Sequence, residues 1–154
     1  MPSILSLEAI KTAATQLGVQ EDPPHANKGV KVNAYLASVG LAPGYSWCAA
    51  FGYWCFDQAA TKLNIPNPLV KTGGVLNHWN LSKATKVTVP QAGDIGIIDH
   101  GKGLGHEVLV RSVDIPKGTY QSIEGNSNEN GSREGFIVCS NTRQIKAAKG
   151  FLRY

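Results

Sequence analysis

Residues 47–63 read WCAAFGYWCFDQAATKL, and this stretch decides the fold. It is too long for a single strand and too apolar for a helix on the surface, so it predicts a helix buried at the centre of the protein. A turn at Ala42–Tyr45 (APGY) precedes it, and Ser46 is expected to cap its start. Cys48 would then lie in the first turn, where backbone N–H groups and the helix dipole stabilise a thiolate.

Other segments with helical spacing of apolar residues surround this one. Leu7–Leu17 predicts a helix that Ser6 caps and Gly18 ends. A second helix is expected at Val32–Val39, stopped by Gly40, and a short one at Gly74–Leu81. The residues between the first two, Glu21–Gly29 (EDPPHANKG), contain two prolines and a glycine and predict a loop.

After Pro90 the pattern changes to short segments typical of strands. These segments are Asp94–Asp99, His106–Val113, Tyr120–Glu124, Phe136–Cys139 and Phe151–Tyr154. Helices first and strands afterwards predict an α+β fold, with N-terminal helices packed on a C-terminal antiparallel sheet.

Length and composition narrow the class of protein. The chain has 154 residues, of which 42% are hydrophobic and 17% charged, and we expect 1–154 to form a single domain. No apolar run is long enough to cross a membrane, and no signal peptide is visible at the N-terminus. The net charge of +4 favours anionic partners, but the basic residues are scattered, which argues against nucleic acid.

The number and positions of the cysteines favour a reactive cysteine over disulfide bonds. Three cysteines are too few, and odd in number, for a disulfide framework, and no zinc-binding spacing is present. Cys55 falls two turns into the central helix, and Cys139 in a strand, so both are expected to be inert. Cys48 alone combines a helix N-terminus with a preceding turn, which makes it the candidate nucleophile.

A cysteine nucleophile requires a base. His25 and His78 lie in polar stretches and are expected to be solvated. His106 begins a strand after the turn GKGLG, where an imidazole can project from a sheet edge towards a helix end. His100 lies at the same turn, and the residue chemistry alone leaves it open as an alternative.

The base in turn needs a group that orients it. Glu124 and Asn126 end the next expected strand, and either could accept the second imidazole N–H if the two strands pair. The alternative is that 125–135 is only a polar loop.

Several motifs in order along the chain resemble the CHAP domain, the cysteine- and histidine-dependent amidohydrolases and peptidases. Pro43–Phe51 (PGYSWCAAF) resembles the nucleophile motif of that family, and Gly93–Gly96 its strand entering the sheet. Gly105-His106 matches its histidine and Glu124–Asn126 its acidic and amide pair. The continuation, with Gly131–Arg133, is similar to a compact phage-associated branch.

The resemblance implies a papain-like fold and hydrolysis of amide bonds in peptidoglycan. It assigns Cys48 as nucleophile, His106 as general base and acid, and Glu124 and Asn126 as the residues that orient the imidazole. Tyr45 is near enough in sequence to be considered for the oxyanion hole.

No cofactor is expected. Some CHAP domains bind calcium in an acidic loop before the cysteine, but here Glu21 and Asp22 stand without an alternating series of Asp or Asn ligands. We therefore expect that no metal is required.

The expected partner is peptidoglycan, acted on by a monomer without stable membrane insertion. Such a protein would be made in the cytoplasm and reach the wall or periplasm after release, as a phage lysin, or after injection, as an antibacterial effector with an inhibitor or immunity protein. Two other functions stay open: an amidase or deamidase acting on a non-wall substrate, and a non-catalytic wall-binding module.

Overall fold

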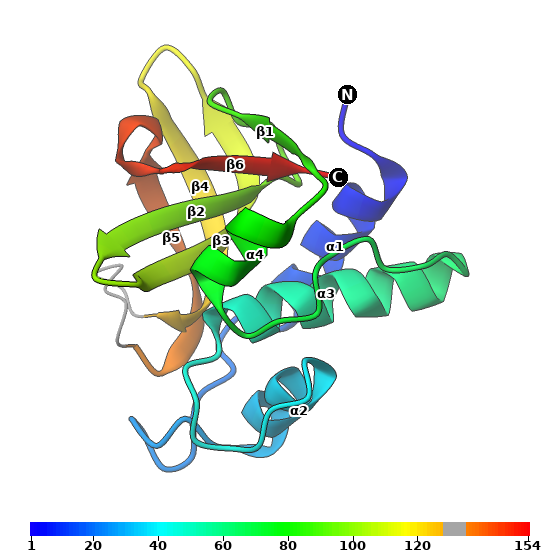
Figure 1. Ribbon diagram of the computed structural model, residues 1–154, viewed down its shortest axis with the longest axis vertical. Coiled ribbons are helices and arrows are strands. Elements are labelled where there is room, and N and C mark those ends of the chain that lie inside the picture. The colour runs from blue at the N-terminus through cyan, green and yellow to red at the C-terminus, as the bar shows by residue number, and fades with distance from the viewer. Residues whose placement is uncertain (128–134) are drawn as a thin grey trace.

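The computed structural model of the protein describes residues 1–127 and 135–154. Within these residues the helices come first and the strands follow (Figure 1). The helices are α1 (Ile4–Thr15), α2 (Val30–Ser38), α3 (Cys48–Leu63) and α4 (Val75–Leu81). The strands are β1 (Thr85–Val87), β2 (Ile95–Gly101), β3 (Leu104–Asp114), β4 (Thr119–Ser127), β5 (Ile137–Gln144) and β6 (Gly150–Arg153), with a short 3-10 helix at Ile145–Ala147.

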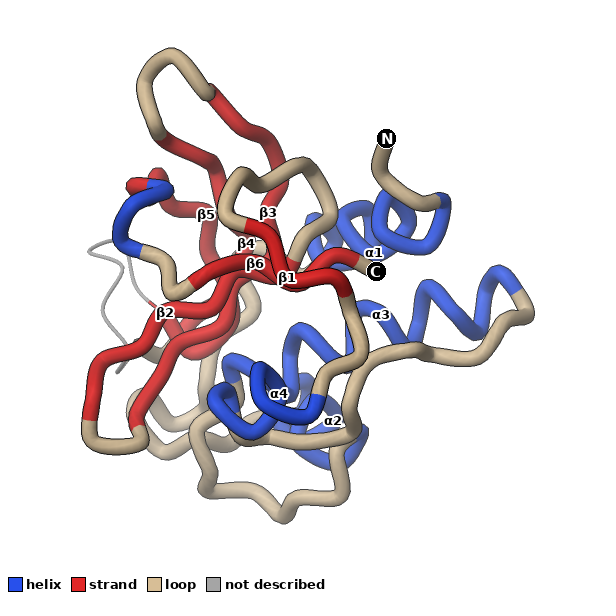
Figure 2. The backbone as a smooth tube through the Cα atoms, turned by 45° about the horizontal axis from the view of Figure 1, so that its top comes forward, coloured by secondary structure: helices blue, strands red, loops and turns tan. Residues whose placement is uncertain are grey.

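The strands form one antiparallel sheet in the order β1-β6-β2-β3-β4-β5. The helices gather on one side of this sheet, as both views of the backbone show (Figures 1 and 2). The sequence-based prediction of an α+β fold, helices packed on an antiparallel sheet, is therefore confirmed.

Helix α3 forms the centre of the hydrophobic core, as its composition predicts. Its first turn lies against the sheet, and its last turn projects away from it (Figure 1). Phe51, Cys55, Phe56 and Ala59 are almost completely buried against α1, α2 and the sheet. Such a helix derives its stability from tertiary packing rather than from helix propensity.

The helix starts differ in detail from the sequence-based predictions. The cap of α1 is Ser3, whose hydroxyl accepts a hydrogen bond from the backbone N–H of Ser6 at 3.0 Å. Ser6 itself is buried inside the helix and donates to the backbone carbonyl of Tyr154. For α3, Trp47 occupies the cap position without a side-chain capping bond, so the prediction that Ser46 caps this helix is wrong. Cys48 nevertheless begins the helix, as expected.

Alternation along β3 places neighbouring side chains on opposite faces of the sheet. Glu107 and Leu109 face the helices, and Leu109 belongs to the main core. Val108 and Val110 face the other way and join Tyr120 and other residues in a smaller apolar cluster. His106 shares the face of Val108, so His106 and Glu107 point in opposite directions.

Two features of the sheet were not predicted. The edge strand β1 (TKV) is short and half polar, so it carries no alternating pattern, and it forms by pairing with β6. Strand β5 continues five residues beyond Cys139, to Gln144. The Gly131–Arg133 motif lies outside the described residues. None of the described helices has the length and hydropathy needed to span a membrane.

Candidate active site

Cys48 is the first residue of α3, and only 5% of its surface is exposed. Its position is fixed by Trp47, whose indole N–H donates to Glu21 Oε1 at 2.8 Å and whose ring stacks on Tyr35. Glu21, which looks like an isolated loop carboxylate in the sequence, is therefore a buried anchor for the segment that leads into Cys48.

Strand β4 approaches the first turns of α3 very closely at Gly125. A side-chain Cβ at this position would lie 2.7 Å from the Trp47 ring and 2.8 Å from Phe51 Cβ. Both neighbours are buried aromatic residues that have little room to move. Glycine at 125 thus permits the close contact that brings Glu124 to the N-terminal end of α3, where Cys48 lies.

His106 lies on β3, completely buried, between Cys48 and Glu124. Its Nε2 lies 3.2 Å from Glu124 Oε1. Its other nitrogen, Nδ1, is buried and makes no close hydrogen bond within the described part of the chain. Nδ1 is therefore the nitrogen left for Cys48. Burial acts to lower the pKa of His106, but its interactions with Cys48 and Glu124 outweigh burial and raise that pKa to about 9.

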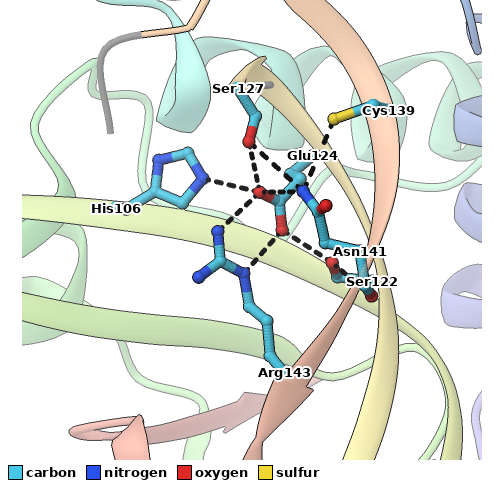
Figure 3. Close-up of polar contacts among 7 residues, drawn as sticks. All are labelled: His106, Ser122, Glu124, Ser127, Cys139, Asn141 and Arg143. Atoms are coloured by element: carbon cyan, nitrogen blue, oxygen red, sulfur yellow. Dashed lines mark hydrogen bonds and ion pairs between the residues drawn. The ribbon is translucent and has the colours of Figure 1, made fainter. Parts of the chain in front are cut away.

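Glu124 is buried and accepts hydrogen bonds from several directions (Figure 3). Arg143 donates from Nε to Oε2 at 2.7 Å and from Nη2 to Oε1 at 2.6 Å. Ser122 donates to Oε2 at 2.6 Å, whereas Ser127 and Asn141 donate to Oε1 at 2.5 and 3.0 Å. Burial acts to raise the pKa of Glu124, but the bonds from Arg143 and His106 prevail and lower it well below its usual range.

Asn126 is placed beside this network but not within it. It is buried, has a left-handed backbone (φ 51°), and lies where the pairing of β4 with β5 shifts by a bulge. Neither Oδ1 nor Nδ2 of its amide has a hydrogen-bond partner among the described residues. The structure therefore brings Cys48, His106 and Glu124 together, whereas the buried Asn126 amide has no partner in 1–127 or 135–154.

Sequence reasoning missed the residues that hold Glu124. Arg143 and Asn141 lie on the part of β5 beyond Cys139, which the strand prediction did not reach. Cys139, Asn141 and Arg143 alternate along this strand, and Cys139 pairs with Glu124 in the register of β4 and β5. The alternation of these three residues was the signal available in the sequence.

The other histidines differ from His106. The prediction that His78 is solvated is wrong: it is buried, with Nδ1 2.8 Å from Glu107 Oε2 and Nε2 2.7 Å from the hydroxyl of Tyr154. The last turn of α4 carries this histidine into the interior. His25 is exposed in its loop, as expected. His100, which the sequence left open as an alternative base, is also exposed, and it lies near the end of β2 rather than in the turn.

The other cysteines are less suited to nucleophilic attack. Burial raises the pKa of Cys55 well above its ordinary value. Burial also raises the pKa of Cys139, which is half-buried near Ser127 and Asn141. Tyr45, considered for the oxyanion hole, is more than half exposed.

The arrangement of Cys48, His106 and Glu124 suits nucleophilic catalysis. An imidazole between a sulfur atom and a carboxylate is able to take the proton of a thiol, and the carboxylate stabilises the positive charge that the ring then carries. Backbone N–H groups at the start of α3 are available to an oxyanion formed by attack of that sulfur. No group of three or more potential metal-ligating side chains occurs in 1–127 or 135–154.

Comparison with known proteins finds a matching family and similar solved structures. The CHAP domain family model matches residues 40–126, more than half of the chain. Among solved structures, the crystal structure of Ly7917 is similar, with a TM-score of 0.54 and 16% identity over 96% of this chain and 61% of that one. A structure of Ly7917 with the hydrolysis product of MDP gives a TM-score of 0.53 and 18% identity over 96% and 62%.

At this identity the likeness to Ly7917 shows the fold alone. The chain spans less than two thirds of the length of Ly7917. A comparison with curated proteins found no match.

Proposed function

Since the chain belongs to the CHAP domain family, we propose that it is a cysteine-dependent hydrolase that cleaves amide bonds in the peptides of bacterial peptidoglycan. One observation carries the proposal: buried His106 is bonded through Nε2 to Glu124 and leaves Nδ1 for Cys48 at the start of α3. The structure of the similar protein Ly7917 with the hydrolysis product of MDP supports the choice of substrate class.

The mechanism we propose is acyl transfer in two steps. The Cys48 thiolate attacks the carbonyl carbon, and the carbonyl oxygen becomes an oxyanion near the backbone N–H groups of the first turn of α3. His106 gives its Nδ1 proton to the leaving amine as the C–N bond breaks. The neutral imidazole then takes a proton from water, the resulting hydroxide attacks the thioester, and the acid product leaves Cys48.

Glu124 and Asn126 have different roles in this proposal. Glu124 accepts from Nε2, which holds the ring with Nδ1 towards Cys48 and stabilises the imidazolium. Asn126 has a buried amide without a partner among the described residues, so it is able to bond a group that substrate or the reacting histidine brings.

The place of action is part of the proposal. The net charge of +4 favours association with the anionic polymers of a bacterial wall. We propose that the protein acts there after release from the cytoplasm or after injection.

Incubation of purified peptidoglycan with the protein, followed by separation and mass analysis of the soluble fragments, tests this function. We expect fragments whose masses increase by one water per cleaved amide bond. The new N-terminus distinguishes the bonds: cleavage between glycan and peptide frees the first residue of the stem peptide, whereas peptide cleavage frees an amine further along. Cys48→Ala should release no fragments, and Cys55→Ala, assayed below its melting temperature, should act as the wild type. Intact peptidoglycan after treatment with folded wild-type protein would refute the proposal.

A further inference from the structure

The carboxylate of Glu124 carries a second ion pair that the proposed chemistry does not use. Arg143 reaches it from β5 with two parallel hydrogen bonds, one to each oxygen (Figure 3). The Glu124 side chain is completely buried, and only 15% of the Arg143 side chain is exposed. A bidentate pair of this kind fixes both the position and the plane of the carboxylate.

The oxygen that Arg143 holds most closely is the same oxygen that accepts from His106. Oε1 lies 2.6 Å from Arg143 Nη2 and 3.2 Å from His106 Nε2. Ser122, Ser127 and Asn141 also donate to the carboxylate, but they are neutral. Within the described residues, Arg143 is thus the permanent positive charge in contact with Glu124.

When a buried carboxylate lies next to a buried imidazolium, proton transfer between the two groups competes with the ion pair. In a medium of low dielectric constant, the proton on Nε2 is able to move to Oε1, which converts two charges into two neutral groups. The neutral imidazole would then no longer stabilise a thiolate at Cys48. A guanidinium that cannot lose its own proton favours the carboxylate form and opposes this transfer.

We propose that Arg143 is a positioning residue that keeps Glu124 ionised and aligned, so that the proton shared by Cys48, His106 and Glu124 stays on His106. The inference rests on the proposed function, because it assumes that Cys48 acts as a thiolate. It adds Arg143 as the fourth residue in a line of contacts that runs from Cys48 through His106 and Glu124.

Other titratable groups face this carboxylate. They are His106 on β3, Arg143 and Cys139 on β5, and Tyr120 on β4 itself. Burial raises the pKa of the Tyr120 hydroxyl to about 12 and also raises the pKa of Cys139, so both stay neutral in weakly acidic solution. On the acidic side of neutrality, the group whose protonation Arg143 controls is therefore Glu124.

The test measures the rate of Cys48 alkylation by iodoacetamide against pH, read by peptide mass mapping, in the wild type, Arg143→Met and Arg143→Lys. In Arg143→Met the acidic limb of this profile should move to higher pH, since Glu124 then protonates more readily. A shift of one pH unit lowers the alkylation rate at a given pH on that limb about tenfold. Arg143→Lys keeps the charge and loses the bidentate geometry. The acidic limb of its profile should therefore lie between those of the wild type and Arg143→Met.

Arg153→Met is the matched control. Arg153, on β6, makes a similar bidentate pair with buried Asp94, at 3.0 and 2.7 Å. Three strands, β2, β3 and β4, separate β6 from β5 in the sheet. Loss of that pair should lower stability and leave the alkylation profile unchanged. In the Glu124→Gln background the further change Arg143→Met should no longer move the profile, because position 124 no longer titrates.

A wild-type profile in folded Arg143→Met would overturn the inference. If Arg143→Met does not fold, Arg143→Lys takes its place: a profile moved in the same direction by a smaller amount supports the inference, and an unmoved profile overturns it. Alkylation needs no wall substrate. A shifted profile in a protein that leaves peptidoglycan intact would therefore contradict the proposed substrate and support the role of Arg143.

Discussion

Two buried histidine–glutamate pairs lie back to back on β3, and they differ in one respect that matters for chemistry. His106 and Glu107 are consecutive residues that point to opposite faces of the sheet. His106 bonds Glu124 through Nε2 and keeps Nδ1 free of close hydrogen bonds within the described chain. Glu107, on the other face, bonds His78 through Nδ1, and Tyr154 occupies the second nitrogen of that ring.

The difference shows that a carboxylate partner does not by itself make a histidine a base. The His78 ring has both nitrogens engaged, so it has none to offer a reacting group; its partners tie α4 to β3 and to Tyr154. The His106 ring has one nitrogen directed by Glu124 and one available beside a cysteine. We therefore expect the His78–Glu107 pair to contribute to stability and the His106–Glu124 pair to contribute to activity.

The largest expected effect comes from removing each histidine. His106→Ala should lower the rate of peptidoglycan cleavage at least about 1,000-fold, because the general base and acid is lost. His78→Ala should keep the rate within a small factor and lower the free energy of unfolding by about 3 kcal/mol, because Glu107 loses its buried partner. Fragment release and thermal unfolding measure the two quantities, and exposed His100→Ala should change neither. An active His106 variant together with an inactive, folded His78 variant would reverse the assignment.

Replacing each glutamate by its amide should give the next largest effect. Glu124→Gln should lower the cleavage rate about 100-fold, since a neutral amide holds the imidazolium less strongly. Glu107→Gln should act mainly on the melting temperature. Asn126→Ala should lower the rate and leave the melting temperature close to that of the wild type, because the Asn126 amide has no bond to lose within the described chain. Wild-type rates in Glu124→Gln and Asn126→Ala would mean that neither side chain takes part in catalysis.

The sequence predicts the fold class because the features that indicate it are local, whereas the roles of Cys48, His106 and Glu124 were assigned by the resemblance to the CHAP domain family. A helix with apolar residues on all sides must be buried, and helices followed by alternating strands leave little choice of fold class. The start of α3 also follows from the Pro-Gly turn, although its cap does not: the burial of Trp47 against Glu21, rather than a serine hydroxyl, fixes that end.

What could not be predicted depends on contacts between distant segments. His78 has polar sequence neighbours, and only the packing of α4 on the sheet carries it into contact with Glu107 and Tyr154. Arg143 lies nineteen residues from Glu124, and its role appears only when the register of β4 and β5 is known. Helix packing in the first case and strand register in the second set the partner of the side chain, and local patterns encode neither.

A third prediction compares the cysteines by their reactivity. A limiting dose of iodoacetamide at about pH 6 should label Cys48 first, because the raised pKa of His106 keeps an imidazolium beside that sulfur. Burial raises the pKa of Cys55 and of Cys139, so both should react slowly. Peptide mass mapping identifies the site, and loss of activity should follow the Cys48 label alone. His106→Ala should slow the labelling of Cys48. Equal labelling of all three cysteines in the folded protein would leave Cys48 without support as the nucleophile.

A fourth, smaller effect is the dependence of stability on pH at the His78 pair. Burial acts to lower the pKa of His78, but the charge and hydrogen bond of Glu107 prevail and raise it above the ordinary value of 6.5. A raised pKa in the folded state stabilises the protein fully below 6.5, and this contribution is lost as the pH rises through the folded value. The other titratable group in contact with the ring, Tyr154, has a pKa raised by burial to about 12 and stays neutral over this range.

The difference in melting temperature between the wild type and His78→Gln should therefore be larger at pH 6 than at alkaline pH. The comparison of the two proteins removes the contribution of His106, which titrates in both. A difference that grows with increasing pH would show that His78 is neutral in the folded protein at all these values.

The smallest expected effect is that of a chelator, which should leave the rate of peptidoglycan cleavage unchanged. Calcium takes six to eight oxygen ligands, and the acidic residues before Cys48 are poorly placed to supply them. The Glu21 carboxylate already accepts from the indole N–H of Trp47 on one oxygen and from the backbone N–H of Asn27 on the other. Only Asp22 remains in this loop, and one carboxylate does not form a calcium site. Cleavage rates measured with and without EDTA test this, with a parallel sample to which calcium is added back. Activity that falls in EDTA and returns with calcium would show that the His106 site depends on a metal after all, and that the engagement of Glu21 with Trp47 is not its only role.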